Sequence, residues 1–196
     1  MNDNCGYNLF ERNQLFLKII NDIFAVSALC STKTYIWGGF TIDIIENRFL
    51  REHGDLDGFV DNMFDKLDLL IEEYCKLGYT TEYNQYVKML IIRKDGLHAA
   101  FNQLDVDRKV AMWRHIGDHG TVFFPAEWLD SEPQQFYGVK VYTSGLRFEY
   151  GFRSIAGFLN PDWKYRDKDR EAISIIKDHL LHDNIDLGEI HKVIVY

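Results

Sequence analysis

The sequence has few cysteines, and their arrangement excludes two kinds of structural support. Its three cysteines, Cys5, Cys30 and Cys75, lie far apart, form no Cys-x-x-Cys pair and leave an odd number. This pattern predicts neither a disulfide framework nor a structural zinc site, because both need closely matched sets of cysteines. A reducing cytoplasm is therefore the expected compartment.

Signals for export and for membrane insertion are also missing. The first residues contain no basic region followed by an apolar core, which a secretory signal peptide requires. No apolar run approaches the roughly 18 residues that a membrane-spanning helix needs. We therefore expect neither secretion nor contact with a membrane.

Basic residues are scarce relative to acidic ones. The chain has 22 Lys and Arg against 30 Asp and Glu, which gives a net charge of -8. A nonspecific nucleic-acid surface needs a clustered basic face, so this balance disfavours nucleic acid as a partner. It points instead to a small partner molecule, with a cationic one among the alternatives.

The residues that are present predict a compact globular protein. Hydrophobic residues make up 46% of the 196 positions, which is enough to bury a core within one domain. No internal repeat, low-complexity tract or Gly/Ser linker divides the chain. A soft boundary near Pro133 would separate a core in residues 1–130 from a C-terminal strand and helices in residues 131–196.

The spacing of apolar residues indicates both helices and strands. Helical spacing or capping occurs in residues 8–29, 41–47, 62–77, 144–157 and 170–181, and strand patterns occur in residues 35–37, 55–60, 87–92, 97–104 and 135–143. The tripeptide at residues 94–96 carries the Asp-Gly hairpin pattern between two of these strands. The sequence therefore predicts an α+β protein.

The residues best suited to chemistry lie between positions 37 and 57. Gly38 and Gly39 follow a short strand and precede a helix, and residues without a Cβ let backbone N–H groups approach phosphate oxygens. Asp55 and Asp57 are separated by one residue, so they would share one side of a strand. Such a pair suits Mg²⁺, which prefers one or two carboxylates together with waters and substrate phosphates. Taken singly, a plain turn and a solvated acidic pair are the alternatives.

The combined spacing of this stretch resembles a known family. The frame consists of Gly38 and Gly39, then three residues, Asp43, four residues, Arg48, two residues, Arg51, one residue, His53, and then Asp55 and Asp57. It is similar to nucleotidyltransferases that modify small antibiotics, the lincosamide nucleotidyltransferases and the aminoglycoside 2''-nucleotidyltransferase, within the DNA polymerase beta superfamily. The resemblance implies a mixed sheet of about five strands, with helices packed on one face and a C-terminal helical portion.

The resemblance also implies roles for individual residues. Gly38 and Gly39 would bind the nucleotide, and Asp55 and Asp57 would be the catalytic metal ligands for Mg²⁺. Two further residues of the frame, Arg51 and His53, would contact the nucleotide phosphates or support the site, as would Arg48. A salt-bridged turn that leads into the strand is the alternative for these three residues.

One position departs from the family pattern. In the family, the strand after the hairpin presents a third acidic residue, but residues 97–104 contain no carboxylate and place Ala100 at that point. The same-side neighbours by strand alternation are His98, a candidate catalytic base, and Asn102, a candidate neutral ligand. A half-buried structural histidine is the alternative for His98. Without the third acid a second metal ion would bind less well.

Two later elements are also similar to the family. Basic groups before its last helix reach the nucleotide phosphates, so Lys164 and Lys168 are the expected nucleotide-binding cations here, because nucleotidyl transfer develops negative charge. An ordinary capped helix start is the alternative. Glu127, in a Phe-Pro-x-Glu-x-Leu element, would line the acceptor pocket or act as an acid at a helix N-terminus.

Three functions follow from these patterns. The first is a nucleotidyltransferase that transfers a nucleoside monophosphate from Mg-bound ATP or another triphosphate to a hydroxyl of a small acceptor, by analogy an antibiotic. The second is a nucleotide-binding module with weakened or lost catalysis, because Ala100 replaces the expected acid. The third is a structural or antitoxin-like partner protein. A homodimer is compatible with each of them.

Overall fold

A computed structural model shows the fold and describes residues 11–114, 120–159, 162–192 and 194–195. The helices are α1 (Glu11–Leu29), α2 (Gly39–Ile45), α3 (Met63–Lys76), α4 (Leu146–Leu159) and α5 (Asp167–His182), with short 3-10 helices η2 (Ala126–Trp128) and η3 (Leu187–Lys192). The strands are β1 (Thr34–Trp37), β2 (Leu56–Asp61), β3 (Thr80–Asn84), β4 (Met89–Lys94), β5 (Leu97–Asp107), β6 (Val110–Arg114), β7 (Thr121–Pro125), β8 (Gln134–Phe136), β9 (Val139–Thr143) and β10 (Ile194–Val195).

One mixed sheet joins these strands. Its order is β10-β7-β6-β5-β2-β1-β9-β8, and β4 pairs with β5 and carries β3 at its other edge. The pairs β2–β5 and β1–β9 are parallel, and the other pairs are antiparallel. The two pairs that β2 makes place Trp37 on one side of Asp57 and Ala100 on its other side.

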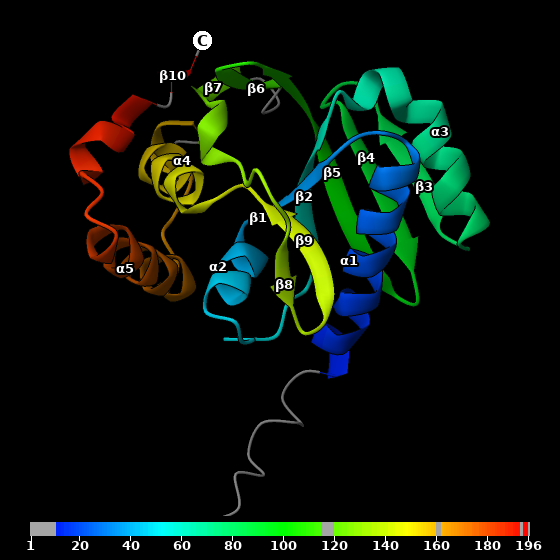
Figure 1. The fold of residues 1–196 in the computed structure, drawn as a ribbon, viewed down its shortest axis with the longest axis horizontal. Coiled ribbons are helices and arrows are strands. Elements are labelled where there is room, and N and C mark those ends of the chain that lie inside the picture. The colour runs from blue at the N-terminus through cyan, green and yellow to red at the C-terminus, as the bar shows by residue number, and fades with distance from the viewer. Residues whose placement is uncertain (1–10, 115–119, 160–161, 193, 196) are drawn as a thin grey trace, which may run out of the picture.

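Helices cover both faces of this sheet. The expectation that helices pack on one face is therefore wrong. Helices α1 and α3 lie on one face and α4 and α5 on the other (Figure 1). The reason lies in the strands, which are apolar on both sides: in β2, Leu56 and Val60 join the core under α1 and α3, whereas Phe59 joins the core under α4 and α5.

Within the described residues the sheet has ten strands, whereas about five were expected. Strands β3, β6 and β7 were not predicted, and residues 135–143 form the β8–β9 hairpin in place of a single strand. The hairpin turns at Tyr137 and Gly138, which both have positive φ. The hairpin predicted at residues 94–96 is confirmed, because Asp95 and Gly96 both have positive φ and Lys94 pairs with Leu97.

Two other sequence predictions have structural outcomes. Cys30 is buried and Cys75 is exposed, and both are free thiols, whereas Cys5 lies outside the described residues.

None of the helices in the described ranges combines the length and the apolar character that crossing a bilayer demands.

The core under α3 gives a direct test of this packing. Phe101 on β5 is fully buried and stacks on Tyr74 of α3 with ring centroids 6.1 Å apart. Phe101→Ala should lower the free energy of unfolding by roughly 3–5 kcal/mol, because it leaves a cavity that the sheet cannot close. Phe64→Ala on α3, where the side chain is 66% exposed, is the control and should cost less than about 0.5 kcal/mol. Urea denaturation measures both, and equal losses would contradict this core.

Candidate functional site

A pocket of about 400 Å³ opens where the β1–α2 turn, the start of β2 and the C-terminal helices meet. One part of its wall is charged and is formed by Arg51, Asp55, Asp57, Arg153, Arg166, Lys168, Asp169 and Glu171. Another part is aromatic or aliphatic and is formed by Trp37, Trp113, Phe152, Ala156, Trp163, Ala172 and Ile175. The pocket therefore has room for a small polar group beside a flat apolar one.

The glycine pair lies directly beside the predicted acidic pair. Gly38 has φ +83°, a left-handed conformation that favours glycine, and a Cβ on it would lie 3.7 Å from Oδ2 of Asp57. Both glycines line the same pocket as Asp55 and Asp57. The structure thus brings together the four residues that the sequence singled out first.

Asp55 and Asp57 reach the pocket in different ways. Asp57 is the second residue of β2, but Asp55 precedes the strand, so strand alternation does not explain why the two carboxylates share the pocket. The pKa of Asp57 is raised from 3.8 to about 7, chiefly by burial and further by the negative charges of Asp55 and Glu149. A cation at this point would relieve that accumulation of negative charge.

These carboxylates fit a Mg²⁺ ion that shares its ligands with a substrate. Mg²⁺ commonly binds through one or two carboxylates, with waters and phosphate oxygens as the remaining ligands. Within the described ranges no group of three or more His, Cys, Asp or Glu side chains is arranged to hold a metal ion. Asp55 and Asp57 would therefore supply the protein ligands, and a phosphate would complete the coordination.

The residues expected on β5 lie beside the acidic pair along the sheet but not on the pocket wall. Ala100 pairs with Asp57 across the parallel β2–β5 ladder, which is the place where the resemblance implies a third acid. His98 is half-buried opposite Arg93, and Asn102 is buried opposite Phe59. Neither His98 nor Asn102 is among the residues that line the pocket.

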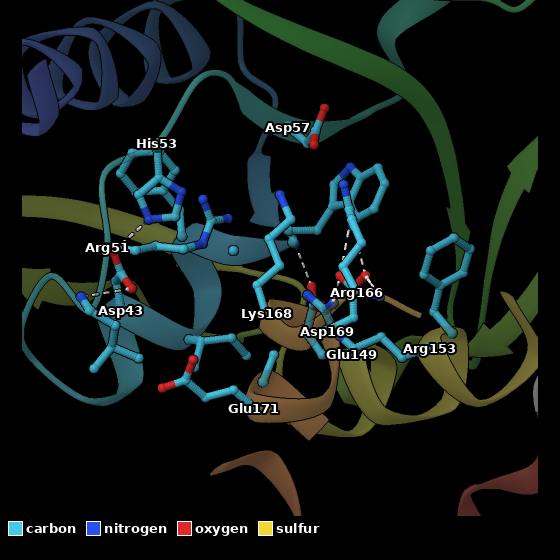
Figure 2. A pocket seen from close by; sticks show the side chains of 18 of the residues that line it. Asp43, Arg51, His53, Asp57, Glu149, Arg153, Arg166, Lys168, Asp169 and Glu171 are labelled. Carbon is cyan, nitrogen blue, oxygen red and sulfur yellow. Dashed lines mark hydrogen bonds and ion pairs between the residues drawn. The ribbon is translucent and has the colours of Figure 1, made fainter. Parts of the chain in front are cut away.

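Several cations approach the acidic pair from the opposite wall. Figure 2 shows Lys168 and Arg166 extending from α5 and the segment before it toward Asp57, with Arg51 on another side. Partial burial lowers the pKa of Lys168, and the charges of Arg51 and Arg166 lower it further. Such mutual repulsion among cations favours the binding of an anion between them. Lys164 is exposed and does not line the pocket.

Glu149 of α4 contributes a buried carboxylate that the sequence did not reveal as a site residue. Its Oε1 accepts hydrogen bonds from the Gly38 N–H at 2.6 Å and from the Ser144 hydroxyl at 3.0 Å. Arg153 donates to its Oε2 at 3.1 Å. Burial raises the pKa of Glu149. The N–H of Gly38 is therefore engaged with a carboxylate of the chain itself.

Ion pairs extend this network into α5. Arg153 also lies 3.7 Å from Asp169, and Arg166 donates two side-chain hydrogen bonds to Asp169, at 2.8 and 3.1 Å (Figure 2). The network links the glycine turn to both C-terminal helices. The spacing of Glu149 and Arg153, four residues apart on one helix, is the sequence signal that could have indicated this pair.

His53 has a partner within the chain. Its Nε2 lies 2.7 Å from Oδ2 of Asp43, and both side chains are 2% exposed. Two other candidates lie at the surface: Glu127 is exposed and is 4.0 Å from Arg147, and Arg48 is exposed and pairs with Glu46. Glu127 and Arg48 are not among the pocket-lining residues.

Comparison with known proteins gives no match at the level of sequence. No family model matches the chain, and no curated protein matches it. Structural similarity, in contrast, extends over most of the chain.

Three solved structures illustrate this similarity. The antibiotic-resistance factor ANT(2'')-Ia, in complex with adenylyl-2''-tobramycin, matches with a TM-score of 0.66 at 16% identity, over 90% of this chain and 94% of that one. The lincosamide antibiotic adenylyltransferase LnuA, bound to lincomycin, gives 0.57 at 14% identity, over 87% and 98%. An antigenic nucleotidyltransferase-like protein from Paracoccidioides brasiliensis gives 0.54 at 11% identity, over 83% and 75%.

At these identities the similarity concerns the fold. The mixed sheet, the glycine turn after β1 and the helices on both faces occur in a chain whose structural neighbours are nucleotidyltransferases. The predicted α+β fold class is therefore confirmed. The chain has the fold of the polymerase beta-like nucleotidyltransferases.

Proposed function

We propose that this protein is a nucleotidyltransferase that moves a nucleoside monophosphate from a Mg-bound triphosphate to a hydroxyl of a small acceptor. The observation that carries this proposal is the meeting of Asp55 and Asp57 with Gly38 and Gly39 in one pocket of a chain with this fold. The acceptor would be a small antibiotic, as in the neighbours crystallised with adenylyl-tobramycin and lincomycin.

The residues of the pocket divide the work of such a reaction. Asp55 and Asp57 would hold Mg²⁺, which neutralises charge on the phosphates and polarises the one under attack. Lys168 and Arg51 would bind the phosphates and the departing pyrophosphate. Gly38 would contribute the left-handed turn that brings the backbone against Asp57, because its N–H is already bonded to Glu149.

The apolar wall would hold the flat parts of the substrates. Trp37, Trp113 and Phe152 contact one another, with ring centroids 5.4 to 5.5 Å apart, and all three line the pocket. Such a surface suits a nucleobase or an acceptor ring. Positioning of the two substrates would then place the acceptor hydroxyl in line with the phosphate that it attacks.

The direct test is release of pyrophosphate that depends on an acceptor. Incubation with Mg-ATP or Mg-GTP and a panel of hydroxylated antibiotics, including tobramycin and lincomycin, should give pyrophosphate and an acceptor heavier by one nucleotidyl group. Asp55→Asn and Asp57→Asn should reduce the rate at least about 100-fold, since the metal ion contributes several kcal/mol to such reactions. Asp65→Asn, an exposed acid on α3, is the matched control. Full activity in Asp57→Asn would refute the assignment.

The Asp57 carboxylate is expected to lower the stability of the fold at the pH at which it would bind the metal ion. A group whose folded pKa lies above its unfolded pKa stabilises the fold when protonated, and this contribution is lost as pH rises through the folded pKa, here about 7. Asp57→Asn should therefore raise the Tm of the metal-free protein at pH 8 by roughly 5 °C, for a gain on the order of 2 kcal/mol.

The gap in Tm between wild type and Asp57→Asn should narrow from pH 8 toward pH 4, because the wild-type carboxylate then becomes protonated. Thermal melts in a chelating buffer from pH 4 to 8 measure this difference. A lower Tm for the variant at pH 8 would show that the ionised carboxylate is not destabilising.

A second candidate function is a nucleotide-binding module that has lost turnover. The position of Ala100, directly across from Asp57, favours it, because a carboxylate there would lie beside the metal pair. In this case the wild type binds Mg-nucleotide without releasing pyrophosphate, whatever the acceptor.

Ala100→Asp separates the two candidates. If turnover was lost with the third acid, this variant should gain acceptor-dependent pyrophosphate release and a steeper dependence on Mg²⁺ concentration, because a third carboxylate strengthens metal binding. Ala25→Asp on the exposed side of α1 is the matched control. Turnover in the wild type would exclude the module, and an inactive Ala100→Asp that still binds nucleotide would exclude the missing acid as the cause.

A further inference from the structure

The segment 50–54 is part of the connection between α2 and β2 and belongs to no helix or strand. The pocket residues that it delivers include Arg51, within it, and Asp55, directly after it. A connecting segment without ladder hydrogen bonds does not fix two side chains by itself. The contacts that hold it therefore decide where the phosphate-binding cation and the metal ligand lie.

Asn13 of α1 holds this segment from one side. Its side chain is fully buried, its Oδ1 accepts the His53 N–H at 2.9 Å, and its Nδ2 donates to the Arg51 carbonyl at 2.7 Å. Arg12 adds a hydrogen bond from Nη2 to the Gly54 carbonyl at 2.9 Å. A single helix end thus binds three backbone groups of the segment.

Asp43 of α2 holds it from the other side. Its Oδ1 accepts the Leu50 N–H at 3.2 Å, and its Oδ2 pairs with the imidazole Nε2 of His53 at 2.7 Å. The ring of Phe40 stacks on that imidazole with centroids 4.0 Å apart. Figure 2 shows this pair joined by a dashed line, and because both side chains are 2% exposed, the pair is shielded from solvent.

Gly39 provides the space that this arrangement needs. A Cβ at this position would lie 2.3 Å from Nη2 of Arg51 and 2.8 Å from Cε1 of His53. Any larger residue would displace the guanidinium group and the imidazole ring. The second glycine of the pair therefore leaves room for side chains of the chain itself, whereas the first provides the left-handed turn.

We propose that Asn13, Asp43 and His53 form a clamp whose role is to position Arg51 and Asp55 for Mg-nucleotide. This inference rests on the proposed nucleotidyltransferase function. Burying a carboxylate, an imidazole and an amide is costly unless every group is bonded, and the bonds here all converge on the one segment that carries a cation and a metal ligand. Displacing such groups by about 1 Å can cost 100-fold in rate. The three clamp residues act through their neighbours and are positioning residues.

The test compares clamp variants with a control that removes a different hydrogen bond to the same helix, α1. Asn13→Ala and His53→Ala should raise the Kd and the KM for Mg-nucleotide about 10-fold or more and leave the KM for the acceptor within about 2-fold. His53→Gln keeps an amide N–H that can donate to Asp43, so it should restore most of the affinity. Tyr79→Phe removes a hydrogen bond to Asp22 of α1, at 2.8 Å, and should leave nucleotide binding unchanged.

Hydrogen exchange provides the readout that does not depend on activity. The amides of Leu50 and His53 should exchange faster in Asn13→Ala and His53→Ala, whereas the β2 amides should keep their protection. Variants with wild-type exchange and wild-type nucleotide affinity would overturn the clamp and leave the proposed function intact. A wild-type protein that binds no Mg-nucleotide would overturn the proposed function, and with it the clamp's role in binding.

Discussion

A largely buried carboxylate with a second acid close by is the constraint on which the site depends. Burial and the charges of Asp55 and Glu149 disfavour the ionised form of Asp57, so the folded chain holds this group at a cost in stability. A cation bound between the acids would offset that cost, and phosphate oxygens would complete its coordination. The left-handed turn at Gly38 brings the backbone close to Asp57.

The remaining structure holds this small region in place from three directions. The ladder between β1 and β2 places Trp37 beside Asp57, and α1 and α2 bind the segment that carries Arg51. The C-terminal helices reach the glycine turn through Glu149, whose carboxylate is paired with Arg153. Because each of these supports comes from a different part of the chain, the site forms only when these elements are packed together.

The sequence predicted best what depends on local spacing. The amphipathic pattern of residues 62–77 identified α3, and the Asp-Gly pair identified the β4–β5 hairpin. Strand β3 escaped prediction because it is a short edge strand of alternating partly exposed residues with little apolar pattern. The two-sided burial of β2 explains why helices cover both faces, and this property follows from tertiary packing.

For the candidate site, the resemblance to a known family assigned to one site several residues that their spacing alone would not have placed together. Gly38, Asp55 and Asp57 do share a pocket. The contact between Glu149 and the Gly38 N–H could not be predicted, because the two residues are 111 positions apart and only the fold brings them together. The pairing of His53 with Asp43 could not be predicted either. A histidine close to two aspartates in the sequence can bind a ligand or can be a buried structural residue, and the sequence does not distinguish the two.

The most direct measurement is a crystal structure with Mg²⁺ and a non-hydrolysable nucleoside triphosphate. One Mg²⁺ is expected at about 2.1 Å from oxygens of Asp55 and Asp57, with the phosphates between that ion and Lys168. A triphosphate bound elsewhere, or a metal ion that contacts neither aspartate, would contradict this assignment of the site.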